Sequence, residues 1–193
     1  MPSICVYCGS SPGKLPAYAA AAAELGRELA RRELGLVYGG ASVGLMGVLA
    51  DAVLEAGGRA VGVIPRSLAD KELAHRGLDD LFVVTSMHER KARMAELADG
   101  FIALPGGWGT LEEIFEALTW AQLGFHDKPC GLLDVGGYYT HLGAFLDHAF
   151  EQNFVREDFR PMIMRDASPI SLLDRFESYR PPRVRKWIGP DET

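Results

Sequence analysis

The chain has 193 residues, of which 48% are hydrophobic and 24% are charged, and this balance excludes a disordered chain and a membrane protein. Lys and Arg number 20 and Asp and Glu number 26, so the net charge of −6 argues against binding to nucleic acid. Three cysteines cannot all pair within one chain, and the N-terminus lacks the pattern of a signal peptide. We therefore expect a cytoplasmic protein with no membrane partner.

Short apolar runs alternate along the chain with longer segments of helical spacing. The short runs predict strands at 4–8, 36–38, 60–64, 81–85, 101–104, 131–135 and 161–164. The longer segments predict helices at 18–32, 45–55, 87–98, 111–123, 139–153 and 170–176. This alternation predicts a single-domain α/β fold, a doubly wound and Rossmann-like parallel sheet with helices on both faces.

The predicted nucleotide-binding domain spans residues 1–179, and residues 180–193 form a predicted C-terminal tail. Residues 66–80 show no clear period, which predicts an excursion from the sheet edge. The tail contains two prolines and a basic cluster. It is either loosely held or an oligomer contact made through Trp187.

Three glycine-rich turns follow predicted strands, at 8–11, 39–44 and 105–110. Ligands of open parallel sheets bind beyond the carboxyl ends of the strands, so three such turns at one edge predict a ligand site. In the third turn, glycines allow close approach of the backbone, and Thr110 is expected to cap the next helix. The unpaired N–H groups of that helix favour a phosphate. The turn matches neither the P-loop nor the dinucleotide fingerprint.

Charged residues next to this turn indicate chemistry as well as binding. Glu112 and Glu113 are expected in the first turn of the helix, where acids stabilise the dipole but are awkward beside a phosphate. Their presence predicts binding of ribose hydroxyls, activation of water or stabilisation of a developing cation. Arg90 and Lys91, near the start of another helix, oppose its dipole. This predicts either a bound anion or pairing with surface acids of their own helix.

The motifs MHERK at 87–91 and PGGWGTLEE at 105–113 together resemble the Lonely Guy family of cytokinin-activating phosphoribohydrolases. The likeness covers about residues 3–165. It implies hydrolysis of a nucleoside 5′-monophosphate, an N6-prenylated AMP or AMP itself, to a free base and ribose 5-phosphate. It also implies a homodimer. Because hydrolysis of this bond requires no metal, we expect neither a metal nor a cofactor.

The resemblance implies that Arg90 and Glu113 are the catalytic pair. It implies substrate contacts at ten further positions, namely Glu72, Lys91, Gly106, Gly107, Trp108, Gly109, Thr110, Leu111, Glu112 and Thr119. A carboxylate at Glu113 suits the reaction, because cleavage of a ribosyl C–N bond builds positive charge on the sugar. Arg90 would neutralise either the 5′-phosphate or the departing base.

Two other function classes stay open. A non-catalytic nucleotide or cofactor carrier of similar fold would share the glycine turns without needing the carboxylate, and a nucleic-acid processing module is disfavoured by the acidic charge. Proteins of this kind have often carried the label lysine decarboxylase, but a pyridoxal enzyme needs a Schiff-base lysine and a larger scaffold. Cys5 and Cys8 form a C-x-x-C without a second ligand pair, so no zinc or redox site is expected.

Overall fold

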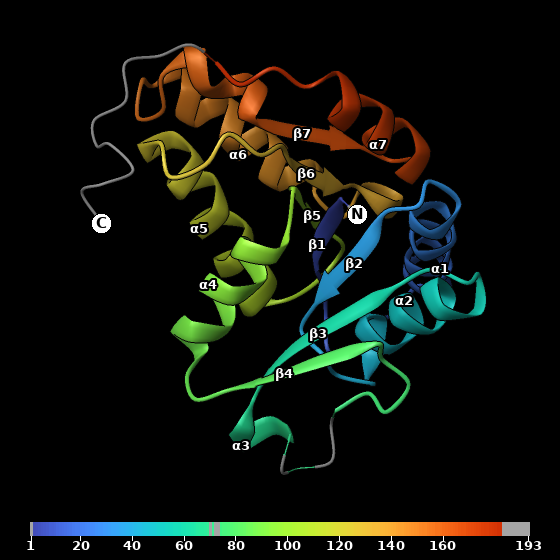
Figure 1. Cartoon of the computed structure of the whole chain (residues 1–193). Coiled ribbons are helices and arrows are strands. Elements are labelled where there is room, and N and C mark those ends of the chain that lie inside the picture. The colour runs from blue at the N-terminus through green and yellow to red at the C-terminus, as the bar shows by residue number, and fades with distance from the viewer. Residues whose placement is uncertain (1, 70, 72–73, 183–193) are drawn as a thin grey trace.

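A computed structural model describes residues 2–69, 71 and 74–182, and in this part of the chain seven strands form one parallel sheet (Figure 1). The strands are β1 (Ser3–Tyr7), β2 (Gly35–Tyr38), β3 (Ala60–Pro65), β4 (Asp80–Val84), β5 (Gly100–Ala103), β6 (Cys130–Leu133) and β7 (Ile163–Asp166). Their order is β4-β3-β2-β1-β5-β6-β7. The order reverses between β1 and β5, and open α/β sheets bind ligands at such a switch point.

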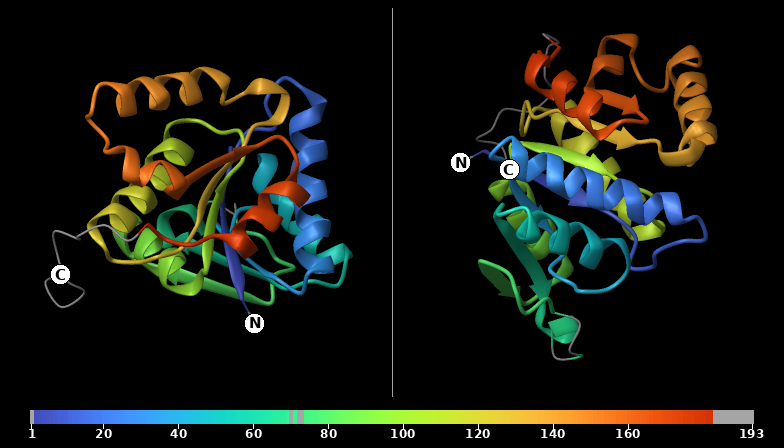
Figure 2. Two further views of the ribbon diagram at one scale, coloured as in Figure 1. Left: turned by 90° about the horizontal axis from the view of Figure 1, so that it is seen from above. Right: turned by 90° about the vertical axis from the view of Figure 1, so that its right-hand side faces the viewer.

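Helices cover both faces of this sheet (Figures 1 and 2). One layer contains α1 (Pro16–Arg31), α2 (Gly44–Glu55) and α7 (Pro169–Ser178), and the other contains α4 (Met87–Leu97), α5 (Trp108–Leu123) and α6 (Thr140–Glu151). Because side chains alternate along a strand, Ile4 and Val6 of β1 pack with the first layer, whereas Cys5 and Tyr7 pack with the second. Burial on both faces explains why the strands are continuously apolar.

The predicted doubly wound fold is confirmed, and the predicted element ends agree with the observed ends within three residues. The last strand was predicted at 161–164 but spans Ile163–Asp166. Pro161 instead lies in the 3-10 helix η2 (Glu157–Met162), since proline has no N–H for a sheet hydrogen bond. Within the 66–80 excursion the sequence patterns missed the short helix α3 (Arg66–Ala69), and they also missed the 3-10 turn η1 (Val135–Gly137).

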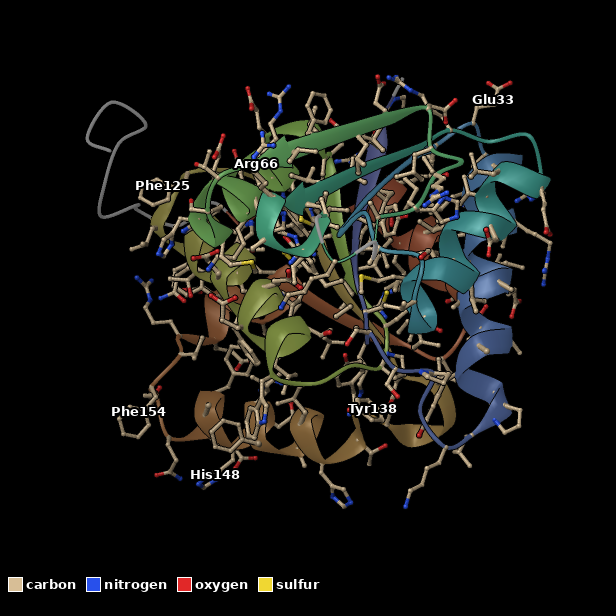
Figure 3. All side chains as sticks on the ribbon, turned by 90° about the horizontal axis from the view of Figure 1, so that it is seen from below. Glu33, Arg66, Phe125, Tyr138, His148 and Phe154 are labelled. Atoms are coloured by element: carbon tan, nitrogen blue, oxygen red, sulfur yellow. The ribbon has the colours of Figure 1, made fainter. Side chains whose placement is uncertain are left out.

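None of the helices in the described ranges is both long and apolar enough to cross a bilayer. Large exposed apolar side chains include Phe154, which projects from the surface after α6 (Figure 3). Trp187 and most of the predicted tail lie outside the described residues. The prediction for that segment therefore stays a prediction.

Candidate active site

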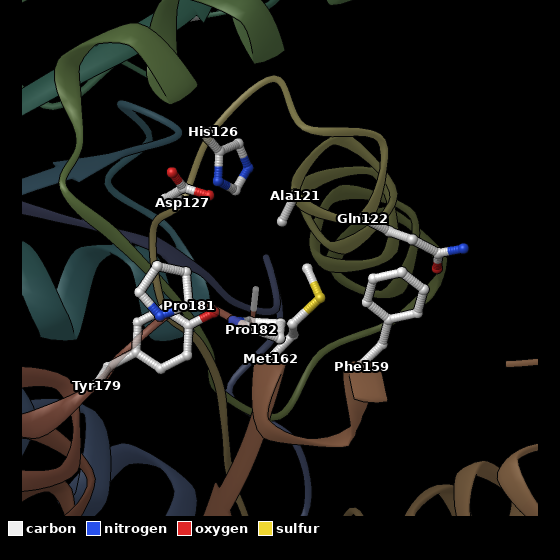
Figure 4. Close-up of a pocket in the computed structure, with 9 residues that line it drawn as sticks. All are labelled: Ala121, Gln122, His126, Asp127, Phe159, Met162, Tyr179, Pro181 and Pro182. Atoms are coloured by element: carbon white, nitrogen blue, oxygen red, sulfur yellow. The ribbon is translucent and has the colours of Figure 1, made fainter. Parts of the chain in front are cut away.

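A cavity of about 510 Å³ lies at the carboxyl ends of β1, β2 and β3, against α4 and α5. All three glycine-rich turns contribute to its wall. Ligand pockets in proteins typically have volumes of roughly 300–1,000 Å³, so this cavity is large enough for a mononucleotide. By contrast, the hollow between the end of α5 and Tyr179–Pro182 has only about 10 Å³, room for a single water (Figure 4).

Arg90 and Glu113 converge in the large cavity, and both line it. The Arg90 Nη1 lies 3.7 Å from the Glu113 Oε1, and each side chain is only 11% exposed. The guanidinium is fixed from behind, because its Nε donates to the Val63 carbonyl at 3.0 Å and its Nη2 donates to the Gly39 carbonyl at 3.3 Å. The expected meeting of a guanidinium from one helix with a carboxyl from another is thus present.

The electrostatic environment of Glu113 is unusual for a carboxyl group. Burial raises its pKa from the ordinary value of 4.5 to about 7, although the nearby Arg90 opposes this rise and the neighbouring Glu112 adds to it. A carboxyl with a pKa near 7 exchanges a proton readily at neutral pH. Perturbed carboxyls of this kind cluster at functional sites.

The start of α5 is open toward the cavity. Gly107 is the N-cap and makes no side-chain capping bond, so the first N–H groups of the helix have no side-chain acceptor. Thr110 was predicted to be the cap, but it is the third helical residue and is buried. Glu112 and Glu113 were predicted in the first turn but lie in the second, because the helix begins at Trp108. This displacement leaves the positive helix end free of carboxylates.

The start of α4 is closed by its own residues instead. Ser86 is the N-cap and accepts a hydrogen bond from the Glu89 backbone N–H at 3.1 Å. The Glu89 carboxylate accepts from the backbone N–H of Thr85, the residue before the N-cap, at 2.7 Å, so Ser86 and Glu89 close the start of the helix much as in a capping box. Side-chain oxygens thus occupy part of the start of α4, whereas the start of α5 has no side-chain cap.

Arg90 and Lys91 of α4 obtain their counter-charges from α5. Lys91 is buried, and its ammonium donates hydrogen bonds to Glu112 and, at 3.0 Å, to Glu116. Neither Arg90 nor Lys91 pairs with the surface acids of its own helix; there, Glu96 pairs with Arg93. The sequence left a bound anion and acids of the same helix as alternatives for Arg90 and Lys91, whereas the structure places carboxylates of α5 beside both side chains.

Of the ten other predicted substrate contacts, nine lie in the described part of the chain. Five of them line the cavity, namely Gly107, Trp108, Gly109, Thr110 and Glu112. Lys91, Gly106, Leu111 and Thr119 are not among the described residues of its wall; Gly106 lines a neighbouring hollow of about 290 Å³. The Thr119 hydroxyl donates to the Phe115 carbonyl at 2.7 Å, and Leu111 packs against the core. Glu72 lies outside the described residues.

Several wall residues were not singled out by the sequence analysis, including Tyr7, Ile64, Leu68 and Met94. Tyr7 and Ile64 occur in apolar runs that predict strands, Met94 occurs in a predicted helix, and Leu68 occurs in the segment without a clear period. None of them carries a sequence signal for a ligand site. Cys8 also lines the cavity, but burial raises the pKa of its thiol and keeps it protonated. Glu116 was missed too. Its spacing of four residues from Glu112 was the available signal, because such residues share a helix face.

Comparisons with known proteins show which family the chain belongs to. The family model described as possible lysine decarboxylase matches residues 46–176. The cytokinin riboside 5'-monophosphate phosphoribohydrolase LOG5 of Arabidopsis thaliana is 50% identical over 178 residues, which cover 92% of this chain and 78% of the relative. The cytokinin riboside 5'-monophosphate phosphoribohydrolase LOG of Oryza sativa subsp. japonica is 49% identical, with 92% and 74% covered.

Solved structures of lower identity share the fold. The molybdenum cofactor binding protein of Rippkaea orientalis has a TM-score of 0.70 at 22% identity, with 92% of this chain and 97% of that chain covered. DNA processing protein A of Helicobacter pylori has a TM-score of 0.54 at 15% identity, with 93% and 82% covered. At these identities the likeness shows the fold alone. The sequence relatives are much closer and extend over nearly the whole chain, and the chain therefore belongs to the Lonely Guy family, whose family model is described as possible lysine decarboxylase.

Proposed function

We propose that this protein hydrolyses the N-glycosidic bond of N6-modified adenosine 5′-monophosphates, releasing the free base and ribose 5-phosphate. The observation that carries the proposal is the pairing of Arg90 with Glu113 inside a cavity that also contains the open end of α5. The phosphoribohydrolases that are about 50% identical to the chain support the same reaction.

The 5′-phosphate binds at the start of α5. The N–H groups of Trp108, Gly109 and Thr110 are the first of the helix, and the helix dipole adds positive character there. A methyl group built on Gly107 or Gly109 would meet no described atom within 4 Å, so the wall at these positions faces open space. Glu113 follows Thr110 by three residues, a rise of about 4.5 Å along the helix. This separation lets one nucleotide contact both.

Glu113 stabilises the positive charge that develops on the ribose as the C–N bond breaks, and it orients and deprotonates the attacking water. Its pKa of about 7 lets it act as a carboxylate in neutral solution and take up the proton of that water. Glu112 is the neighbouring carboxylate at the cavity wall and binds the ribose hydroxyls. No step needs a metal, since the carboxylate itself activates the water.

Arg90 faces the departing base. Because the phosphate has its own site at α5, and because the guanidinium is held beside Glu113, Arg90 is placed to stabilise negative charge on the leaving base. The base then takes up the proton that Glu113 removed from the water, which returns Glu113 to the carboxylate form. Apolar side chains line the same cavity, namely Met46, Ile64, Leu68 and Met87. They favour a substrate whose base carries an apolar N6 substituent, with AMP as a poorer substrate.

The protein acts as a cytoplasmic homodimer in this proposal. The three cysteines have free thiols, as expected in a reducing compartment. The resemblance to the family supports the dimer. Light scattering coupled to gel filtration measures the oligomeric state directly, and a monomer at micromolar concentration would contradict that part of the proposal.

The proposal is tested by incubating the purified protein with isopentenyladenosine 5′-monophosphate and, separately, with AMP. Chromatography should detect free base and ribose 5-phosphate in equal amounts, with faster release from the prenylated nucleotide. Glu113→Gln should lower kcat by about 100-fold or more, the range of acid–base and electrostatic catalysis. A protein that binds these nucleotides tightly but releases no base would instead be a carrier.

A further inference from the structure

Lys91 stands between two carboxylates, and only one of them belongs to the cavity wall. Glu112 lines the cavity, whereas Glu116 lies one helical turn further along α5 and is not among the described wall residues. Both accept hydrogen bonds from the ammonium of Lys91, whose side chain is 8% exposed. The reaction proposed above gives Glu116 no role, yet Glu116 provides half of the partners of a buried cation.

The Lys91 bridge runs beside the Arg90–Glu113 pair. Arg90 and Lys91 are consecutive on α4, and Glu112 and Glu113 are consecutive on α5, so two ion-pair rungs join the same two helices. The Arg90–Glu113 pair is the looser contact, with 3.7 Å between the Arg90 Nη1 and the Glu113 Oε1, while Lys91 makes two direct hydrogen bonds to carboxylates of α5. The Lys91 hydrogen bonds therefore limit how far α4 and α5 can move apart beside Arg90 and Glu113.

We propose that Glu116 is a positioning residue, which acts through Lys91 to hold Arg90 and Glu113 together across α4 and α5. The inference rests on the proposed function for the roles of Arg90 and Glu113. Loss of the Glu116 contact leaves Lys91 with one carboxylate partner, Glu112. The Glu112 side chain is 53% exposed, so it can turn away from Lys91 into the solvent. A buried ammonium that has lost one of its two carboxylate partners is destabilised, so it shifts toward solvent and α4 shifts with it.

The charge of Glu116 also reaches Glu113. The charged groups that act on Glu113 are Arg90 and Lys91 from α4 and Glu112 and Glu116 from its own helix. Burial keeps the nearby thiols of Cys5 and Cys8 and the phenol of Tyr7 neutral. Glu116 raises the pKa of Glu113 and Lys91 lowers it. Neutralising one or the other should therefore move the ionisation of Glu113 in opposite directions.

The test compares Glu116→Gln, Glu116→Ala and Lys91→Met with the wild type, using the pH dependence of kcat/KM from pH 5 to 9. Glu96→Gln is the matched control, because it removes the same charge from an exposed position on α4. Glu116→Ala should lower kcat by tenfold or more with little change in KM, and Glu116→Gln, which keeps an acceptor for Lys91, should restore most of this loss. The acid limb should move down by about 0.5 pH unit in Glu116→Gln and up in Lys91→Met.

Two results would overturn the inference. One is a Glu116→Ala variant that is folded by circular dichroism and keeps wild-type kcat. The other is an acid limb in Glu116→Gln that matches the Glu96→Gln control. Absence of base release by the wild type would refute the proposed function separately. In that case a carbon-13 titration of the Glu113 carboxyl, identified by its absence in Glu113→Gln, tests the coupling without substrate.

Discussion

Glu113→Gln should make the protein more stable at alkaline pH while lowering kcat by about 100-fold or more. In the folded protein the pKa of Glu113 is raised to about 7, chiefly by burial, whereas in the unfolded chain it returns to the ordinary value of 4.5. The folded state therefore binds the proton more tightly than the unfolded state does. As the pH rises from about 4.5 to about 7, the folded protein must give up a proton that it favours, and its stability falls.

The size of this loss follows from the two pKa values. Each pKa unit corresponds to about 1.4 kcal/mol, so the carboxylate costs about 3 kcal/mol of folding free energy above pH 7. Glutamine has nearly the shape of the protonated carboxyl and does not ionise. The difference in free energy of unfolding between Glu113→Gln and the wild type should therefore grow by about 2 to 3 kcal/mol between pH 5 and pH 8.

Urea denaturation at pH 5, 6, 7 and 8, followed by circular dichroism, measures this difference directly. Glu96→Gln serves as the control, since that side chain is 68% exposed and should show no pH-dependent gain. A Glu113→Gln difference that stays constant with pH, or that shrinks as the pH rises, would refute the idea that a buried carboxylate is held at an energetic cost. If the gain appears, it measures the stability that the active site gives up for catalysis.

Three further predictions concern the pocket wall and its supports. Arg90→Ala should lower kcat/KM by about 100-fold or more in steady-state assays and move the acid limb to higher pH, because Glu113 loses its cation. Gly39→Ala places a methyl group 2.1 Å from the Arg90 Nη2, so it should lower kcat by tenfold or more while the thermal unfolding temperature changes little. Gly57→Ala is the control, because Gly57 has a positive φ and lies away from the site. This control should lower the free energy of unfolding by about 1 kcal/mol and leave kcat unchanged. Gly109→Val should fold normally, since a methyl group there meets no described atom, but it should raise KM for the nucleotide at least tenfold. A KM equal to that of the wild type would show that the phosphate does not bind at this loop.

The order of strands and helices could be predicted from the sequence, because it depends on the local pattern of apolar and polar residues. Alternation of apolar runs with helical segments predicted the strands, the helices and their layering, and the glycines that follow β1, β2 and β5 marked the edge where the cavity lies. The resemblance to the Lonely Guy family implied that Arg90 and Glu113 act as a pair, and the structure places their side chains 3.7 Å apart in the cavity. Boundaries were less certain where glycine begins a helix, as at Gly107, since glycine is compatible with both loop and helix N-cap.

Only the tertiary structure decided how the charges are shared. The sequence shows two cations on one helix and several acids on another, but the pairing of Lys91 with Glu112 and Glu116, rather than with a ligand, depends on how α4 packs against α5. The pKa of Glu113 likewise depends on how much water the surrounding elements exclude. Burial and long-range pairing arise from segments far apart in the chain, and no local pattern encodes them.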